Sequence, residues 1–79
     1  MILTPTQCRA ARGLLAWSQD QLAKQADVGN STVRDFEKGR RAPLDENLIA
    51  IRSALEDAGV EFIPAKNGKG VGVRLREVR

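Results

Sequence analysis

The sequence is poor in the residues that carry most enzyme and metal chemistry. It has no histidine and a single cysteine, Cys8, in 79 residues. Intrachain disulfides, zinc fingers and histidine-based catalysis are therefore excluded. There is no glycine-rich phosphate loop either, and carboxylates such as Asp20, Asp45 and Glu46 are interpreted as helix caps and surface charges. We expect no enzymatic activity, no cofactor and no metal.

The chain also lacks the apolar runs that mark membrane or secretory segments. It has no run of about 18 or more apolar residues. Residues 1–5 lack the charged and apolar regions of a signal peptide. These features predict a cytoplasmic, reduced protein. Cys8 recurs with Ala11 and Leu15 at helical spacing, which favours a buried, inert thiol over a redox switch.

The length suits one domain of modest stability, and the charge along it is uneven. A chain of 79 residues buries only about 60–65% of its unfolded surface, so the area added by dimerisation would stabilise it. Residues 1–43 carry +3, residues 44–59 carry −3, and residues 60–79 carry +3. This pattern favours one side that faces a polyanion and one side turned away from it.

Residues 18–37 predict two short helices joined by a tight turn. Ser18 can cap the first helix and Gln21 can reach back to it, which is the capping-box pattern. Asp27 suits the left-handed conformation that ends this helix. The apolar Val28, between polar neighbours, should anchor the turn in the core.

The second helix of this pair has two chemically different faces. Gly29 or Asn30 can cap it, and Val33 and Phe36 point inward. Asn pairs with adenine, Ser with bases or phosphate, and Arg with guanine or phosphate, so the opposite face suits the DNA major groove. That face carries Asn30, Ser31, Arg34, Asp35 and Lys38. Asp35 either accepts from a cytosine amino group or orients Arg34 or Lys38; the alternative for the whole face is a solvated amphipathic helix.

One more helix is predicted on each side of this pair. Thr4 can cap the first, with Pro5 at its first position, and this helix should run to about Ala16. The last should begin near a cap at Asp45 and end at Gly59. The loop before it is either a solvated basic loop or, as we expect, a phosphate contact through Lys38, Arg40 and Arg41.

Residues 60–79 have strand character. Residues 60–63 are β-prone and end at Pro64, residues 65–70 are interpreted as a flexible link, and residues 71–76 alternate apolar and polar. A lone hairpin is marginal in water. The strands therefore either lie on their own domain or, as we prefer, pair across a two-fold axis in a four-stranded sheet between two chains. The side chains expected at that dimer interface are Phe62, Val71, Val73 and Leu75.

Several short motifs resemble the lambda-repressor/Cro-like helix-turn-helix family, also called Xre-type. They are Arg-Ala-Ala-Arg-Gly at 9–13, Trp-Ser-Gln at 17–19, Gln-Leu-Ala at 21–23, Ser-Thr-Val at 31–33, Phe-Glu-Lys-Gly at 36–39 and Ala-Pro at 42–43. The resemblance spans roughly residues 5–58, and the tail is similar to that of small stand-alone bacterial members. It implies a mainly α fold, with a four-to-five-helix domain in residues 1–59 and a C-terminal β-strand pair in residues 60–79. It also implies dimers on pseudo-palindromic operators, usually as repressors.

The resemblance further implies roles for individual residues. Base-reading positions are matched by Asn30, Ser31 and Asp35, with Arg34 at their margin. The family positions that contact the DNA backbone are matched by Gln19, Thr32 and Arg40. Arg12 and Glu37 match a partly buried ion pair between the first and third helices. Two positions depart from the family pattern, because Asp27 replaces the usual turn glycine and Gly29 replaces a Ser or Thr cap.

Two functions follow from this sequence. The first is a dimeric, sequence-specific DNA-binding regulator, most often an autorepressor, and the small size fits a phage or mobile-element regulator. The second is a protein-interaction module, such as an antitoxin or anti-activator, that binds a partner protein through helix 44–59 or the tail. Only the first requires the polar face of the helix that carries Asn30 and Ser31 to contact bases.

Overall fold

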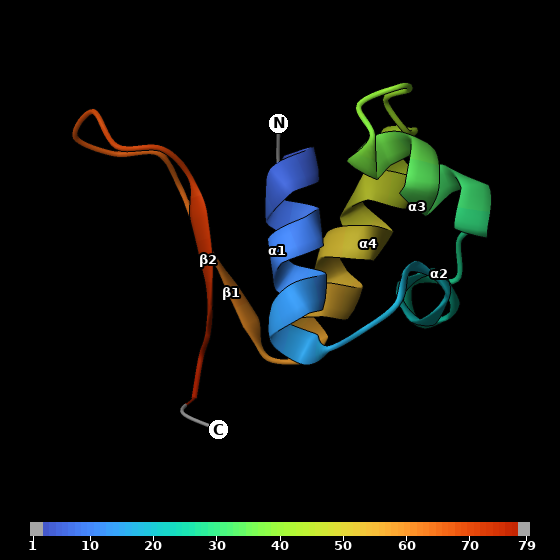
Figure 1. The fold of residues 1–79 in the computed structure, drawn as a ribbon, viewed down its shortest axis with the longest axis horizontal. Helices are drawn as coiled ribbons and strands as arrows, with labels where there is room; N and C mark the ends of the chain where they lie inside the picture. Colours follow the sequence, from blue (N-terminus) through green and yellow to red (C-terminus); the bar gives the residue numbers. More distant parts are fainter. Residues whose placement is uncertain (1–2, 78–79) are drawn as a thin grey trace.

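The computed structural model describes residues 3–77 as four helices followed by a two-stranded antiparallel sheet (Figure 1). The elements are α1 (Pro5–Leu15), α2 (Gln19–Ala26), α3 (Asn30–Glu37), α4 (Asp45–Asp57), β1 (Val60–Ile63) and β2 (Gly72–Leu75). The predicted mainly α fold with a C-terminal strand pair is confirmed. No described helix has the length and apolar content needed to span a bilayer.

Local capping signals set the starts of the first two helices. The Thr4 hydroxyl accepts from the Gln7 backbone N–H at 3.1 Å, and the Gln7 side chain accepts from the Thr4 N–H at 3.0 Å. This capping box begins α1, with Pro5 at its first position as predicted. Ser18 caps α2 by accepting from the Gln21 N–H at 3.0 Å. Within residues 3–77 the Gln21 side chain does not return the predicted hydrogen bond to Ser18. Of these two helices, only α1 therefore has a complete capping box.

The turn between α2 and α3 follows the sequence prediction. Asp27 ends α2 in the left-handed region, with φ 56° and ψ 46°. Val28 donates its N–H to the Ala23 carbonyl at 3.0 Å and packs partly buried against the core. Gly29 precedes α3 in an extended conformation and supplies no side-chain cap. Helix α3 therefore begins with one fewer satisfied backbone donor than a Ser or Thr cap would give.

Replacing Gly29 with Ser should stabilise this helix start. A Cβ at Gly29 would lie 3.6 Å from the Thr32 hydroxyl and 3.8 Å from the Ser31 hydroxyl, which is ordinary contact. The extended backbone accepts serine, whose hydroxyl can bond a free N–H of the first turn. We expect a gain of a few tenths of a kcal/mol in the free energy of unfolding. Thermal melts of Gly29→Ser and Gly29→Ala check this, since only serine adds a cap; an equal gain in both would assign it to the loss of glycine.

Helix α4 begins at Asp45, as the sequence predicts, but its cap lies one residue earlier than predicted. Leu44, not Asp45, is the cap residue, because its carbonyl accepts from the N–H groups of both Asn47 and Leu48 at 3.0 Å. Asp45 and Glu46 thus occupy the first turn of α4. Their negative charges still stabilise this helix end, through the helix dipole rather than through a capping hydrogen bond.

The core lies between the helices and extends under the sheet. Its fully buried side chains come from every layer of the fold: Leu3, Cys8, Ala11, Leu22, Val33, Ile51, Leu55 and Val60. Because Val60 belongs to β1, the C-terminal strands complete the helical core. The sheet packs on α1 and α4, on the side away from α2 and α3 (Figure 1).

The hairpin packs on its own domain, and a four-stranded sheet between two chains stays a prediction. In its register Val60 pairs with Leu75 and Phe62 with Val73. Phe62 is only 8% exposed, and Val73 and Leu75 pack partly buried against the same core. Three of the four side chains expected at a dimer interface are therefore used by their own chain. Val71, at 42%, is the exposed one.

The link at residues 65–70 is an ordered turn rather than a flexible segment. Lys66 forms a β-bridge with Lys69, and each donates its N–H to the other's carbonyl, at 3.1 and 3.0 Å. Asn67 and Gly68 make the turn, with φ 53° and 76°. Two consecutive left-handed residues are the requirement of a tight hairpin turn, and Asn-Gly is the pair that meets it most readily.

Candidate nucleic-acid interface

A buried ion pair fixes α3 against α1. Glu37, the last residue of α3, is 3% exposed. Arg12 of α1 donates two hydrogen bonds to its carboxylate, from Nε to Oε2 at 2.8 Å and from Nη2 to Oε1 at 2.7 Å. The remaining guanidinium nitrogen of Arg12 donates to the Trp17 carbonyl at 3.0 Å. One arginine therefore joins the end of α3 to the connection between α1 and α2.

Two further side chains complete the coordination of this carboxylate. The Gln19 amide donates to Oε1 and the Cys8 thiol to Oε2, each at 3.0 Å. Burial raises the pKa of Glu37, but the hydrogen bonds from Arg12, Gln19 and Cys8 outweigh it, and the pKa lies below its ordinary value. Burial and the bond to Glu37 raise the pKa of the Cys8 thiol, so it stays protonated and inert.

Gln19 combines a place at the start of α2 with a hydrogen bond to α3. It is the first residue of α2, where the resemblance implies a phosphate contact, and it also donates to Glu37. One amide hydrogen is thereby used inside the protein, while the second hydrogen and the backbone N–H at the start of α2 remain as donors. The bond ties the orientation of α2 to that of α3.

The outward face of α3 presents a row of polar side chains. Ser31 and Arg34 are exposed, and Asn30 and Asp35 are partly exposed. The Asn30 amide donates to the Asp20 carboxylate on α2. This bond orients Asn30 and leaves its carbonyl oxygen and second amide hydrogen free. A carbonyl acceptor beside an amide donor is the arrangement that pairs with adenine in the major groove.

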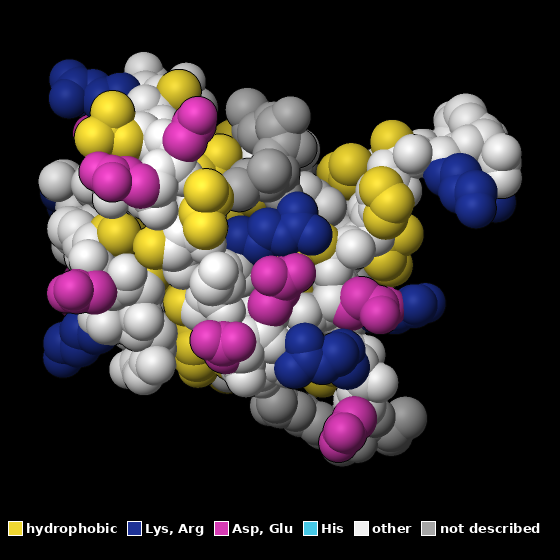
Figure 2. Space-filling view, turned by 180° about the vertical axis from the view of Figure 1, so that it is seen from behind, with side chains coloured by type: hydrophobic (Ala, Val, Ile, Leu, Met, Phe, Trp, Pro, Cys, Tyr) yellow, Lys and Arg dark blue, Asp and Glu magenta, His cyan; other side chains and the backbone are white. Residues whose placement is uncertain are grey.

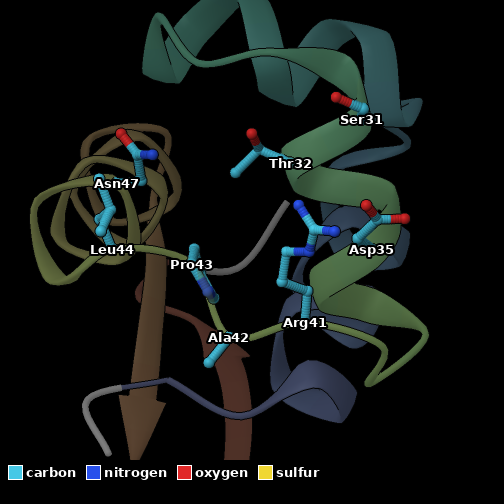
Figure 3. Close-up of a pocket in the computed structure, with 8 residues that line it drawn as sticks. All are labelled: Ser31, Thr32, Asp35, Arg41, Ala42, Pro43, Leu44 and Asn47. Atoms are coloured by element: carbon cyan, nitrogen blue, oxygen red, sulfur yellow. The ribbon is translucent and has the colours of Figure 1, made fainter.

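A hollow of about 320 Å³ opens beside this row, between α3 and the loop that leads to α4. Its walls are Ser31, Thr32, Asp35, Arg41, Ala42, Pro43, Leu44 and Asn47. Figure 3 shows the Thr32 and Arg41 side chains directed toward the space between α3 and the loop. The α3 wall is polar, whereas the other wall combines the apolar Ala42, Pro43 and Leu44 with Arg41 and Asn47. Leu44 is 67% exposed. The hollow can accept a ligand that has both a charged and an apolar surface.

The predicted phosphate-binding cations lie on the same loop. Lys38, Arg40 and Arg41 are exposed and form no ion pair within residues 3–77. Gly39, with φ 71°, turns the chain after α3, and the Arg40 N–H donates to the Asp35 carbonyl at 2.9 Å. The structure thus brings the loop cations to one end of the polar row on α3.

The family model described as helix-turn-helix matches residues 9–56, well over half of the chain and including all of α2 and α3. This chain belongs to the lambda-repressor/Cro-like, or Xre-type, helix-turn-helix family. No curated protein matches it. Membership makes this Xre-type protein a DNA-binding regulator with a helix-turn-helix, and its members are generally not enzymes.

Helix α4 of this Xre-type regulator is acidic. Four carboxylates lie on α4: Asp45, Glu46, Glu56 and Asp57. Figure 2, seen from behind, shows acidic side chains over the helical body, interspersed with Lys and Arg side chains.

Sequence reasoning missed several partners that this site uses. Cys8 and Gln19 come from α1 and α2, and neither spacing nor composition indicates that they meet Glu37. The Asp20–Asn30 bond crosses the turn between α2 and α3, and Asp20 was interpreted only as a cap or surface charge. Its position ten residues before Asn30, across the predicted turn, was the one available signal.

Proposed function

We propose that this protein is a dimeric, sequence-specific repressor that binds a pseudo-palindromic operator, its own promoter included. The observation that carries the proposal is the polar row on α3 together with the hollow and the unpaired cations beside it. Base edges and backbone are the two surfaces that a duplex offers, and sequence-specific proteins contact both. The Glu37 network behind α3 supports this role because it holds the reading helix rigidly.

Base reading is assigned to the exposed positions of α3. Asn30, held by Asp20, pairs with adenine, and Ser31 bonds a neighbouring base or phosphate. Arg34 suits guanine. Asp35 accepts from a cytosine amino group, because no side-chain ion pair within the described residues engages it.

Backbone contacts are assigned to the residues around the polar row: Gln19, Thr32, Lys38, Arg40 and Arg41. The hollow supports this assignment for one strand of the duplex. Thr32 and Arg41 donate to a phosphate there, while Pro43 and Leu44 pack against the adjoining deoxyribose. These contacts place the protein on the duplex without reading its sequence.

A fluorescence-anisotropy titration tests the proposal. Wild-type protein is added to the duplex upstream of its own gene and to a scrambled duplex of equal composition, at physiological salt. We expect a preference of about a thousandfold or more for the first. The three loop cations of each protomer give six phosphate contacts per dimer, so log Kd should change with log salt with a slope of about 5. Equal, weak and salt-sensitive binding to both duplexes would contradict the proposal for this operator.

A second candidate is a protein-interaction role, as an antitoxin or anti-activator. Ile49 on α4 is 54% exposed, beside acidic residues that a duplex would repel. An exposed apolar side chain on a non-DNA face favours a protein contact there. This role gains weight if the titration shows no preferred duplex.

A further inference from the structure

The turn of the hairpin forms an arm that extends beyond the helical body. We call residues 64–71 the β-arm; all eight are exposed. The arm continues the strand register from Ile63–Gly72 to the bridge at Lys66–Lys69. At the rise of a strand this is about 10 Å beyond the sheet. Figures 1 and 2 show it extending away from the helices.

The β-arm has a basic tip and an apolar base. Lys66 and Lys69 flank the turn, and neither forms an ion pair within residues 3–77. Pro64 and Ala65 lie on one side of the base and Val71 on the other. The apolar base borders a hollow with Gln7, Arg52 and Phe62 of its own domain. Its side chains nevertheless stay exposed and the lysines form no ion pair within residues 3–77, which points to a surface outside this domain.

A surface of opposite character lies on α4 of the same chain. Positions 45, 46, 49, 53 and 57 share one side of the helix by their spacing, and all are exposed. We call Asp45, Glu46, Ile49, Ser53 and Asp57 the α4 outer face. The three acids form no ion pair within residues 3–77. Ile49 provides an apolar side chain between the acidic ones. The β-arm has the matching arrangement, an apolar base next to two lysines.

We propose that the β-arm of one chain docks on the α4 outer face of a second copy. Lys66 and Lys69 lie against Asp45 and Glu46, and the apolar base of the arm covers Ile49. A two-fold axis repeats the contact in the opposite direction, so the interface contains it twice. This inference rests on the dimer of the proposed function and names its contact surfaces.

Charge complementarity selects a second copy as the partner. Residues 44–59 carry −3 and residues 60–79 carry +3, so each chain supplies both halves of the contact. The exchange covers Ile49 and Val71, two of the exposed large apolar side chains of residues 3–77. None of the residues in this contact lies on α3 or among Lys38, Arg40 and Arg41.

A charge-reversal cycle tests the docking. Sedimentation equilibrium gives the dimer dissociation constant of the wild-type chain, of Lys66→Glu/Lys69→Glu, of Asp45→Lys/Glu46→Lys, and of the combined variant. Each pair alone places like charges together, so we expect the dissociation constant to rise by about a hundredfold. The combined variant restores opposite charges and should return to within about tenfold of wild type. Lys24→Glu, on an exposed lysine of α2, is the matched control and should leave dimerisation unchanged.

Circular dichroism and thermal melts identify any variant that fails to fold. The lysine pair lies in an exposed arm outside the core, so this half of the cycle reports on docking even if the α4 pair loses helix stability. Failure of the combined variant to dimerise, although folded, would overturn the proposal. So would a monomeric wild-type chain, or lysine reversals that weaken DNA binding and leave the dimer intact, which would place the arm on DNA.

A monomeric wild-type chain would contradict both proposals, but for a dimeric chain the charge-reversal cycle and the DNA titration test them separately. Restored dimerisation without any preferred duplex supports the arm contact and contradicts the repressor. A strong operator preference with an unresponsive dimer supports the repressor and contradicts the arm contact.

Discussion

Replacing Arg12 with methionine should lower the free energy of unfolding by about 3–5 kcal/mol at neutral pH. The substitution keeps an unbranched side chain but removes both bonds to the Glu37 carboxylate. Glu37 is 3% exposed, so its charge would remain buried without its cation, which is the costly way to break a buried pair. In a domain of this size such a loss corresponds to a fall in melting temperature of about 15–30 °C.

The pH dependence of this effect distinguishes an electrostatic cause from lost packing. In the wild type, hydrogen bonding to Arg12 lowers the pKa of Glu37 despite its burial. The carboxylate therefore contributes stability above its unfolded pKa of 4.5, and this stability is lost as the pH falls through the folded value. In Arg12→Met, burial dominates and raises the pKa, so lowering the pH protonates Glu37 and relieves the penalty. The stability gap between the two proteins should narrow from pH 7 toward pH 4.5.

Urea unfolding at several pH values measures this gap. The matched control is Arg12→Met/Glu37→Met, in which no charge remains buried and packing is largely kept. We expect it to be more stable than Arg12→Met at pH 7, since replacing both members of a buried pair is often neutral or favourable. A stability difference between wild type and Arg12→Met that stays constant with pH would show that the pair acts by packing alone. A double variant as unstable as the single one would show the same.

Replacing Asn30 with alanine should relax sequence preference, whereas replacing Arg41 should weaken binding to every duplex. Asn30 is oriented by Asp20 at the start of α3, and a bidentate base contact contributes about 1–3 kcal/mol of discrimination. The operator-to-scrambled affinity ratio should therefore fall by about 5- to 150-fold per half-site. Ser31→Ala should act in the same direction with a smaller effect, because one hydroxyl makes fewer bonds.

Arg41 lines the hollow and is expected to contact a phosphate. Arg41→Ala removes one such contact per protomer, so the salt slope of a dimer should fall by about 2 while the affinity ratio stays constant. Anisotropy titrations of both variants on both duplexes at three salt concentrations separate the two patterns. Equal losses on the two duplexes for Asn30→Ala would remove it from the base-reading set.

Most of the helical architecture could be predicted because its signals are local. Thr4 and Pro5, Ser18, and Asp27 each act within four residues of their own position, and the structure uses them as predicted. The cap of α4 is Leu44 rather than Asp45, because the Leu44 carbonyl, which no side-chain pattern reveals, makes the first helical bonds. The roles of Asn30, Ser31 and Arg34 at DNA remain predictions, since exposure on one face is necessary for base reading without being sufficient.

The sequence by itself determined the four helices, the strand pair, the family and the polar face of α3. Each of these depends on residue spacing and on motifs that lie within short segments. Only the tertiary structure decided that Cys8 and Gln19 join Arg12 around Glu37, because these residues come from three helices. It also decided that Phe62 serves its own core and that residues 64–71 form an ordered arm. Those outcomes depend on which surfaces of α1 and α4 contact the hairpin. Contacts between segments that are far apart in the chain leave no repeating pattern in the sequence from which they could be predicted.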